Sequence, residues 1–135
     1  MRVIAIDYGD ARTGIAISDP TGSICGSAYT IHEKSRKRVV RTITDKAAEV
    51  SAETLVLGYP KNMDGSIGPR AEIAEELKAL LERETGLPVV LWDERRTTVD
   101  AHRILSENGR RGQTRKNTVD AVAATLILEG YLGSL

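Results

Sequence analysis

The pattern of apolar and polar positions predicts a meander of three strands in the first quarter of the chain. Apolar runs at residues 2–8, 14–19 and 23–32 are separated by short stretches rich in glycine, proline and aspartate. Such stretches are typical of tight turns between hairpin strands. The run from Val3 to Ile6 is continuous rather than alternating, which is typical of a central strand buried on both faces.

From residue 35 the apolar positions repeat with a helical period, and helices then alternate with short apolar runs. Ser35 is suited to cap one helix, and Pro69 to open another that Gly86 ends. The predicted elements are a helix after Ser35, a strand at 54–58, a helix from Pro69 to Gly86, a strand at 88–92, a helix from Thr97 to Asn108, and a helix from Thr118 to about Leu132.

The resulting order, βββαβαβαα, predicts an α/β fold with one mixed sheet of five strands. Helical crossovers are right-handed, so they place the first, fourth and fifth strands parallel, and the hairpins add an antiparallel edge. The carboxyl ends of the parallel strands then meet at one edge. A length of 135 residues is enough for one core and too short for two, so we expect a single domain over residues 1–135.

Acidic residues from three distant segments are expected at that edge. Asp7 ends the first strand, Asp93 and Glu94 follow the fifth, and Asp120 lies in the expected first turn of the last helix. Each has an ordinary explanation: a turn, an arginine pair, or the helix dipole. Together they are harder to explain, because two carboxylates about 4 Å apart repel by about 4 kcal/mol at an effective dielectric constant near 20.

A divalent cation would remove this repulsion. Carboxylate ligands without a cysteine cluster or histidine pair suit Mg²⁺ or Mn²⁺ and disfavour zinc. Two such ions about 3.5–4 Å apart can activate water and stabilise the leaving oxygen of a phosphodiester. The residues therefore predict hydrolysis of phosphodiester bonds.

The formal net charge is zero, but basic residues cluster in two segments. Residues 34–46 hold six bases and one acid, as a solvated helix face also would. The segment 110–116 has no apolar residue and predicts a mobile basic loop. The free N–H groups of the helix that opens at Pro69 also suit a phosphate. The residues expected to contact nucleic acid are Arg12, Lys61, Asn62, Arg70, Arg95, Arg110, Arg111, Arg115 and Lys116.

Four motifs occur in order along nearly the whole chain: Asp7-Tyr8-Gly9, the segment 57–70, Trp92-Asp93-Glu94-Arg95, and Asp120-Ala121-Val122. They resemble the bacterial YqgF (RuvX-like) family. The resemblance implies an RNase H-like fold, kinship with Holliday junction resolvases, and a nuclease that matures the 5′ end of pre-16S ribosomal RNA.

The same resemblance implies that Asp7, Glu94 and Asp120 form the metal-binding, catalytic set. Asp93 is then a neighbour that supports the site or pairs with Arg95. Two positions depart from the family pattern: Arg96 stands where an apolar residue is frequent, and Ala11 where lysine is common. These departures bear on substrate preference more than on chemistry.

Three alternative functions are open at this point. The same chemistry could resolve branched DNA junctions, which calls for a dimer. The acids could be structural in a non-catalytic RNA-binding module. The segment 7–10 also resembles the phosphate loop of actin-like ATPases, although those need two such domains.

The expected partners are precursor ribosomal RNA and ribosomal particles, for a monomer or weak dimer. A single cysteine, Cys25, suits a reducing cytoplasm. No apolar run reaches the roughly 20 residues that span a bilayer, so no membrane partner is expected.

Overall fold

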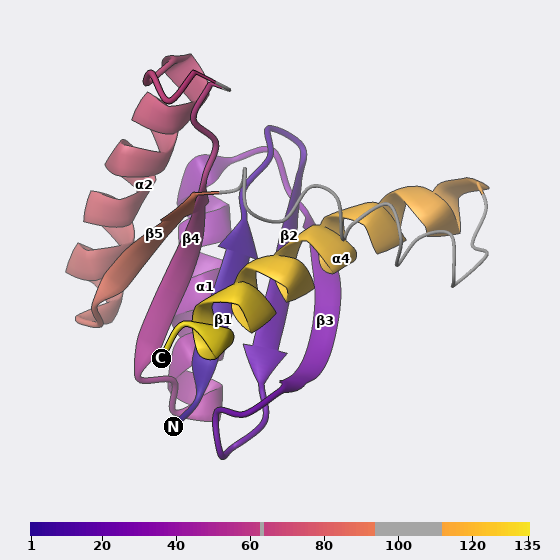
Figure 1. The fold of residues 1–135 in the computed structure, drawn as a ribbon, viewed down its shortest axis with the longest axis vertical. Helices are drawn as coiled ribbons and strands as arrows, with labels where there is room; N and C mark the ends of the chain where they lie inside the picture. Colours follow the sequence, from indigo (N-terminus) through magenta and orange to yellow (C-terminus); the bar gives the residue numbers. More distant parts are fainter. Residues whose placement is uncertain (63, 94–111) are drawn as a thin grey trace.

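A mixed sheet of five strands lies between two helical layers in the computed structural model, which describes residues 1–62, 64–93 and 112–135 (Figure 1). The strand order is β3-β2-β1-β4-β5. β1 pairs antiparallel with β2, and β2 with β3, whereas β1, β4 and β5 run parallel. This arrangement confirms the predicted meander and parallel strands. The strands are β1 (Val3–Asp7), β2 (Arg12–Ser18), β3 (Cys25–His32), β4 (Thr54–Tyr59) and β5 (Val89–Asp93).

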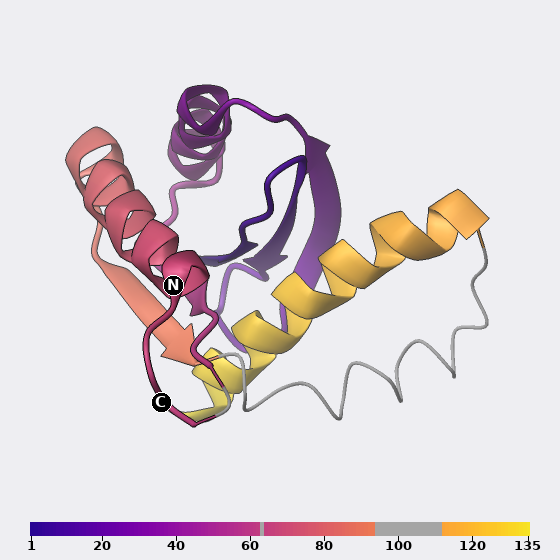
Figure 2. The same ribbon diagram turned by 90° about the horizontal axis from the view of Figure 1, so that it is seen from above.

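Two helices cover one face of the sheet and one long helix crosses the other. α1 (Arg36–Val50) and α2 (Pro69–Thr85) lie side by side on the first face. α4 (Gly112–Gly133) runs obliquely over β1, β2 and β3 on the second (Figures 1 and 2). The sheet therefore has a buried core on each side.

β1 contributes alternate side chains to both cores. Ile4 and Ile6 pack in the core under α1 and α2, while Val3 and Ala5 pack in the core under α4. All four are fully buried. This two-sided burial explains why the run is continuously apolar, as predicted for a central strand.

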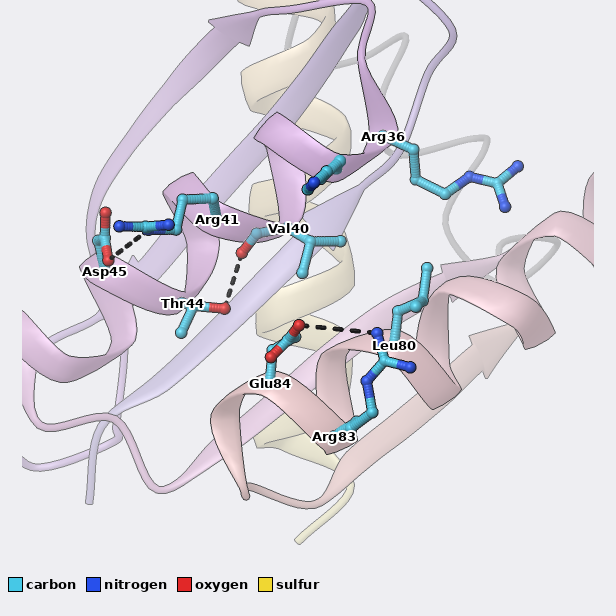
Figure 3. A pocket seen from close by; sticks show the side chains of 9 residues that line it. Arg36, Val40, Arg41, Thr44, Asp45, Leu80, Arg83 and Glu84 are labelled. Carbon is cyan, nitrogen blue, oxygen red and sulfur yellow. Dashed lines mark hydrogen bonds and ion pairs between the residues drawn. The ribbon is translucent and has the colours of Figure 1, made fainter.

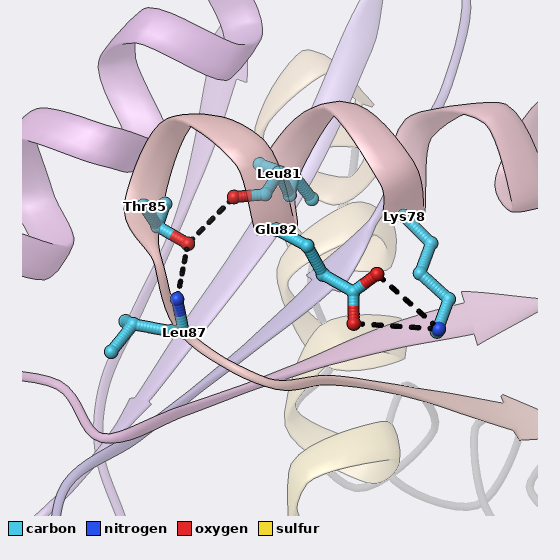
Figure 4. Close-up of polar contacts among 5 residues, drawn as sticks. All are labelled: Lys78, Leu81, Glu82, Thr85 and Leu87. Atoms are coloured by element: carbon cyan, nitrogen blue, oxygen red, sulfur yellow. Dashed lines mark hydrogen bonds and ion pairs between the residues drawn. The ribbon is translucent and has the colours of Figure 1, made fainter.

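The helix ends are fixed by local hydrogen bonds and backbone conformation. Ser35 Oγ accepts from the backbone N–H of Arg38 at 3.4 Å, so Ser35 is the N-cap of α1 as predicted. Gly86 adopts a left-handed conformation at the end of α2. Thr85 Oγ1 donates to Leu81 O at 2.6 Å and accepts from Leu87 N at 3.1 Å (Figure 4). This hydroxyl therefore connects the last turn of α2 to the chain that enters β5.

The second and third strands begin at different residues from those predicted. β2 starts at Arg12 rather than residue 14, because Arg12 is already paired with His32 of β3. β3 starts at Cys25 rather than residue 23. The Asp19 carboxylate accepts from the backbone N–H groups of Ser23 and Ile24, which holds that stretch in the turn.

The last helix begins six residues earlier than predicted. α4 starts at Gly112, so residues 112–116 are helical and the predicted basic loop is wrong for them. Glutamine, arginine and lysine have good helix propensity, and no proline interrupts this segment. The prediction took the polar composition as evidence for a loop. The helix predicted at residues 97–108 lies outside the described residues.

None of the helices in the described ranges is both long enough and apolar enough to cross a membrane.

Trp92 locks the end of β5 to the end of α4. Its side chain is only 9% exposed and meets the Tyr131 ring edge-on, with ring centroids 6.5 Å apart. Gly130 lies directly against the indole, so that a Cβ there would be 2.8 Å from Cζ2 of Trp92. Trp92 is therefore a core residue.

We expect Gly130→Ala to destabilise the protein by about 1–3 kcal/mol, because overpacking a rigid aromatic contact outweighs the gain of up to about 1 kcal/mol in helix propensity. Urea unfolding would measure the change. Gly133→Ala is the matched control in the same helix, since a Cβ at Gly133 meets nothing within 4 Å. Equal stability of the two variants would contradict the packing argument.

Candidate functional site

Asp7 stands at the carboxyl end of β1, where the strand leaves the sheet. Its side chain is half-buried, and its backbone pairs with Gly14 of β2. Asp7 follows Val3 and Ala5 in the strand alternation, so it belongs to the face that α4 covers. The hairpin turns at Gly9, where a Cβ would collide with the carbonyl of Arg12. A glycine is therefore required two residues after the candidate ligand.

A small pocket opens beside Asp7 at this edge. Its wall includes Arg70 from the first turn of α2 and Asp10 from the hairpin, whose guanidinium and carboxylate are 3.8 Å apart. Both side chains are largely exposed, so the pair contributes at most about 1 kcal/mol and leaves Arg70 available to an incoming phosphate. The lining residues are Asp7, Tyr8, Asp10, Gly58, Pro60, Arg70, Ile73 and Ala74.

Asp93 belongs to the opposite face of the sheet from Asp7. It pairs in register with Tyr59, and it follows Val89 and Leu91, which pack on the core under α1 and α2. Trp92, one residue earlier, packs on the α4 side. The strand alternation therefore assigns Asp93 and Asp7 to different faces of the sheet, and the role of Asp93 stays a prediction.

Asp120 lies in the third turn of α4 and not in the first turn as predicted, because α4 begins at Gly112. The helix dipole acts mainly on the first turn, so it no longer explains an acid at this position. Asp120 precedes Ala124 by four residues and Ile127 by seven, and both of these pack in the same core as Val3 and Ala5. Position 120 is therefore about one and two helical turns before core residues of α4.

Other members of the predicted site lie outside the described residues. These are Glu94, Arg95, Arg110 and Arg111. Arg115 and Lys116 belong to α4. Among the described side chains, no three histidines, cysteines or acids are grouped closely enough to hold a metal ion. The half-buried carboxylate of Asp7, beside a pocket at the carboxyl edge, fits a hard-cation ligand, and the complete metal set stays a prediction.

Lys61 and Asn62, two of the residues predicted to contact nucleic acid, interact with other side chains in the loop after β4 and in β4 itself. Asn62 Nδ2 donates to Ser66 Oγ at 3.0 Å, and the backbone carbonyl of Asn62 accepts from Gly65 N at 2.8 Å. Asn62 therefore closes the loop, whatever else its exposed side chain contacts. The Lys61 ammonium lies 5.4 Å from the Tyr59 ring centroid. Arg12 is exposed at the start of β2, at the same edge as Asp7.

Tyr59 is a buried residue of this edge that the sequence did not single out. Its hydroxyl donates to Glu75 Oε2 of α2 at 2.6 Å, and this hydrogen bond raises the pKa of Tyr59 to about 12. A phenol with this pKa stays protonated at neutral pH, so Tyr59 ties β4 to α2. Asp10, which lines the pocket and pairs with Arg70, was also not predicted as a site residue. Its position directly after Asp7-Tyr8-Gly9 was the only feature of the sequence that could have indicated it.

The chain matches the family model described as "RuvX: Holliday junction resolvase" over residues 1–134. It is 47% identical to a protein of Lachnospira eligens over 99% of this chain and 98% of the relative. It is 42% identical to a protein of Clostridium novyi over the full length of both. Both relatives carry the name "Putative pre-16S rRNA nuclease".

Two solved structures share the fold at low sequence identity. Thermus thermophilus RuvC, in complex with a Holliday junction substrate, has a TM-score of 0.65 at 13% identity and covers 99% of this chain and 97% of that one. Fowlpox virus resolvase, with Holliday junction DNA, has a TM-score of 0.61 at 12% identity and covers 99% of this chain and 98% of that one. The fold is therefore RNase H-like, as the resemblance implied.

We expect Tyr59→Phe to remove an alkaline loss of stability. The folded-state pKa of Tyr59, about 12, exceeds the ordinary value of 10.0. The contribution of the Tyr59–Glu75 hydrogen bond to the free energy of unfolding is therefore complete below about pH 10 and is lost as the pH rises through about 12. Urea unfolding between about pH 9 and pH 12 would measure the slope. Glu75→Gln, which removes the charge that holds the proton, should flatten it in the same way. An equally steep decline in all three proteins would contradict this assignment.

Proposed function

The chain belongs to the RuvX family, whose model is described as Holliday junction resolvase, and from this membership we propose that it is a metal-dependent nuclease that matures the 5′ end of pre-16S ribosomal RNA. The observation that carries the proposal is similarity over the whole length of relatives named as pre-16S rRNA nucleases, at 42–47% identity. Similarity of this extent favours a shared substrate class over a shared fold alone.

The proposed catalytic set is Asp7, Glu94 and Asp120. Asp7 supports this set because it combines half-burial, a pocket and a place on the α4 face. Asp120 supports it because it lies in the third turn of α4, where the helix dipole gives an acid little benefit. These carboxylates would hold Mg²⁺ or Mn²⁺, proposed as a pair of ions. When bound, such ions supply the positive charge that activates water and stabilises the leaving oxygen of a phosphodiester.

The residues proposed to hold the RNA surround the same edge. Arg70 and Lys61 flank the start of α2, where the exposed N–H groups of the first turn suit a phosphate. Arg12 lies at the start of β2 at this edge. Arg115 and Lys116 belong to the first two turns of α4, and this end of the helix extends beyond β3 in Figure 2. The remaining proposed contacts are Asn62, Arg95, Arg110 and Arg111.

Cleavage of branched DNA junctions is the second candidate function. It is favoured by the family description and by the fold shared with two junction-bound resolvases. The chemistry would be the same and only the substrate would differ. A cleavage assay that compares a pre-16S 5′ end, an unrelated single-stranded RNA and a four-way DNA junction separates the two functions. We also propose a cytoplasmic location, association with ribosomal particles, and a monomer or weak dimer.

We expect Asp7→Asn, Glu94→Gln and Asp120→Asn each to reduce metal-dependent cleavage by more than the roughly 10–100-fold typical of residues that only support a ligand. Each change removes one negative charge from the proposed metal site and keeps the shape of the side chain. Initial rates with Mg²⁺ and with Mn²⁺, on protein with an unchanged unfolding curve, would measure the loss.

Asp93→Asn is the matched control, because Asp93 lies next to the proposed ligand Glu94 but belongs to the other face of the sheet. Its cleavage rate should fall by no more than the roughly 10–100-fold typical of supporting residues. Full activity in any of the three variants would remove that residue from the catalytic set.

We expect neutralisation of Arg110, Arg111, Arg115 and Lys116 to glutamine to weaken RNA binding and flatten its salt dependence. Each lost phosphate contact lowers the slope of log K against log salt by about 0.7 for a single strand, so four contacts lower it by about 3. Fluorescence anisotropy with a labelled RNA, under metal-free conditions, would measure the slope. The double variant Lys46→Gln and Lys78→Gln is the control, because both lysines pair with glutamates outside this segment. An unchanged slope would show that the segment does not contact RNA.

A further inference from the structure

A groove separates the N-terminal half of α1 from the C-terminal half of α2, on the face of the sheet opposite α4 (Figure 3). Its volume is about 740 Å³, far more than the small pocket beside Asp7. The groove is open to solvent along the seam between the two helices. Its lining residues are Arg36, Lys37, Val40, Arg41, Thr44, Asp45, Leu80, Arg83 and Glu84.

The floor of the groove is apolar. Val40 of α1 is 6% exposed, and Leu80 of α2 is half-buried beside it. Thr44 donates its hydroxyl to the carbonyl of Val40 at 2.7 Å, so this polar group is already satisfied within α1 (Figure 3). The aliphatic stems of the lining arginines and lysine extend this apolar surface. An occupant would therefore gain by placing aliphatic side chains between the helices.

The rim of the groove has more basic than acidic residues. Lys37 makes no ion pair within the part of the chain that the structure describes. Arg41 pairs with Asp45 at 3.6 Å, and Arg83 with Glu84 at 3.6 Å. Arg41, Asp45, Arg83 and Glu84 are largely exposed in these pairs, and exposed pairs of this kind contribute about 0–1 kcal/mol. Carboxylates of an incoming molecule can therefore replace Asp45 and Glu84 as partners of Arg41 and Arg83 at little cost in free energy.

We propose that this groove binds an acidic amphipathic helix of a partner protein. Leucine-like side chains of that helix would occupy the floor over Val40 and Leu80. Its glutamates or aspartates would face Lys37 and Arg41, in the helix-in-groove mode of peptide recognition. The complementary charge mainly sets orientation and association rate, and burial of the apolar stripe supplies most of the affinity.

A nucleic acid fits this groove less well. Asp45 and Glu84 lie in the rim, and Glu76 of α2 approaches Arg36 at 4.0 Å. A phosphate backbone carries a negative charge at every residue and cannot avoid these acids, whereas a helix can place its carboxylates only opposite Lys37 and Arg41. None of the nine lining residues is aromatic, so the groove offers no ring for a base to stack on. The proposal is independent of the nuclease activity, because no residue that lines the groove belongs to the proposed catalytic or RNA-binding set.

The test uses the full chain and three synthetic probes. The first is a helical peptide of about 16 residues with leucines at positions i, i+3, i+4 and i+7 and glutamates on the flanks. The second replaces each glutamate by lysine, and the third is a single-stranded RNA of random sequence. Fluorescence anisotropy measures affinity, and methyl NMR spectra locate the bound peptide through Val40 and Leu80.

The proposal expects the acidic peptide to bind with shifts at both methyl groups, and the lysine peptide to bind at least about tenfold more weakly. Lys37→Glu with Arg41→Glu should reverse this preference. The control is Lys34→Glu with Arg38→Glu, an equal charge change at exposed positions that do not line the groove. It should retain the preference of the unmodified protein.

No binding of the acidic peptide at about millimolar concentration overturns the proposal, since that is the weak limit of specific recognition. Equal binding of both peptides, or binding that leaves the Val40 and Leu80 signals unchanged, also overturns it. If the RNA probe binds the groove and the acidic peptide does not, the groove is a nucleic-acid surface and the proposal is wrong. Cleavage activity should be unchanged in both charge-reversal variants, which keeps this test separate from that of the nuclease.

Discussion

The rest of the structure depends on the burial of β1 from both sides. Four consecutive apolar residues place this strand in the middle of the sheet, with one core under α1 and α2 and another under α4. A strand fixed in this way can present a polar side chain only where it leaves the core. Asp7 is that residue, so the packing constraint on Val3 to Ile6 also fixes the place of the candidate ligand.

The period of two along each strand then sorts the acids at the carboxyl edge. Asp7 belongs to the α4 face, whereas Asp93 belongs to the face of α1 and α2. Asp120 comes from α4, which packs on the same face as Asp7. Carboxylates that share a face are the ones whose repulsion a metal ion can relieve. The strand alternation therefore gives Asp93 a different environment from Asp7.

Much of the fold could be predicted because its signals are local. Strand runs, the Ser35 cap, Pro69 and Gly86 all act within a few residues, and the crossover rule converts their order into the observed sheet. The start of α4 could not be predicted in this way, because helix propensity favoured a helix there whereas the polar composition favoured a loop. The Tyr59–Glu75 and Asp10–Arg70 contacts were also missed. Each joins residues from different elements, and nothing in either local sequence identifies its partner.

The two faces of the sheet carry different chemistry for a related physical reason. α4 is a single helix laid obliquely on the sheet, and its apolar residues Ala124, Ile127 and Leu128 pack in the core that it covers. α1 and α2 are two amphipathic helices side by side, and each must end its buried stripe at the seam between them. A seam of this kind exposes apolar floor and charged rim together, as in the groove above Val40 and Leu80. The groove between α1 and α2 therefore shares no lining residue with the pocket beside Asp7.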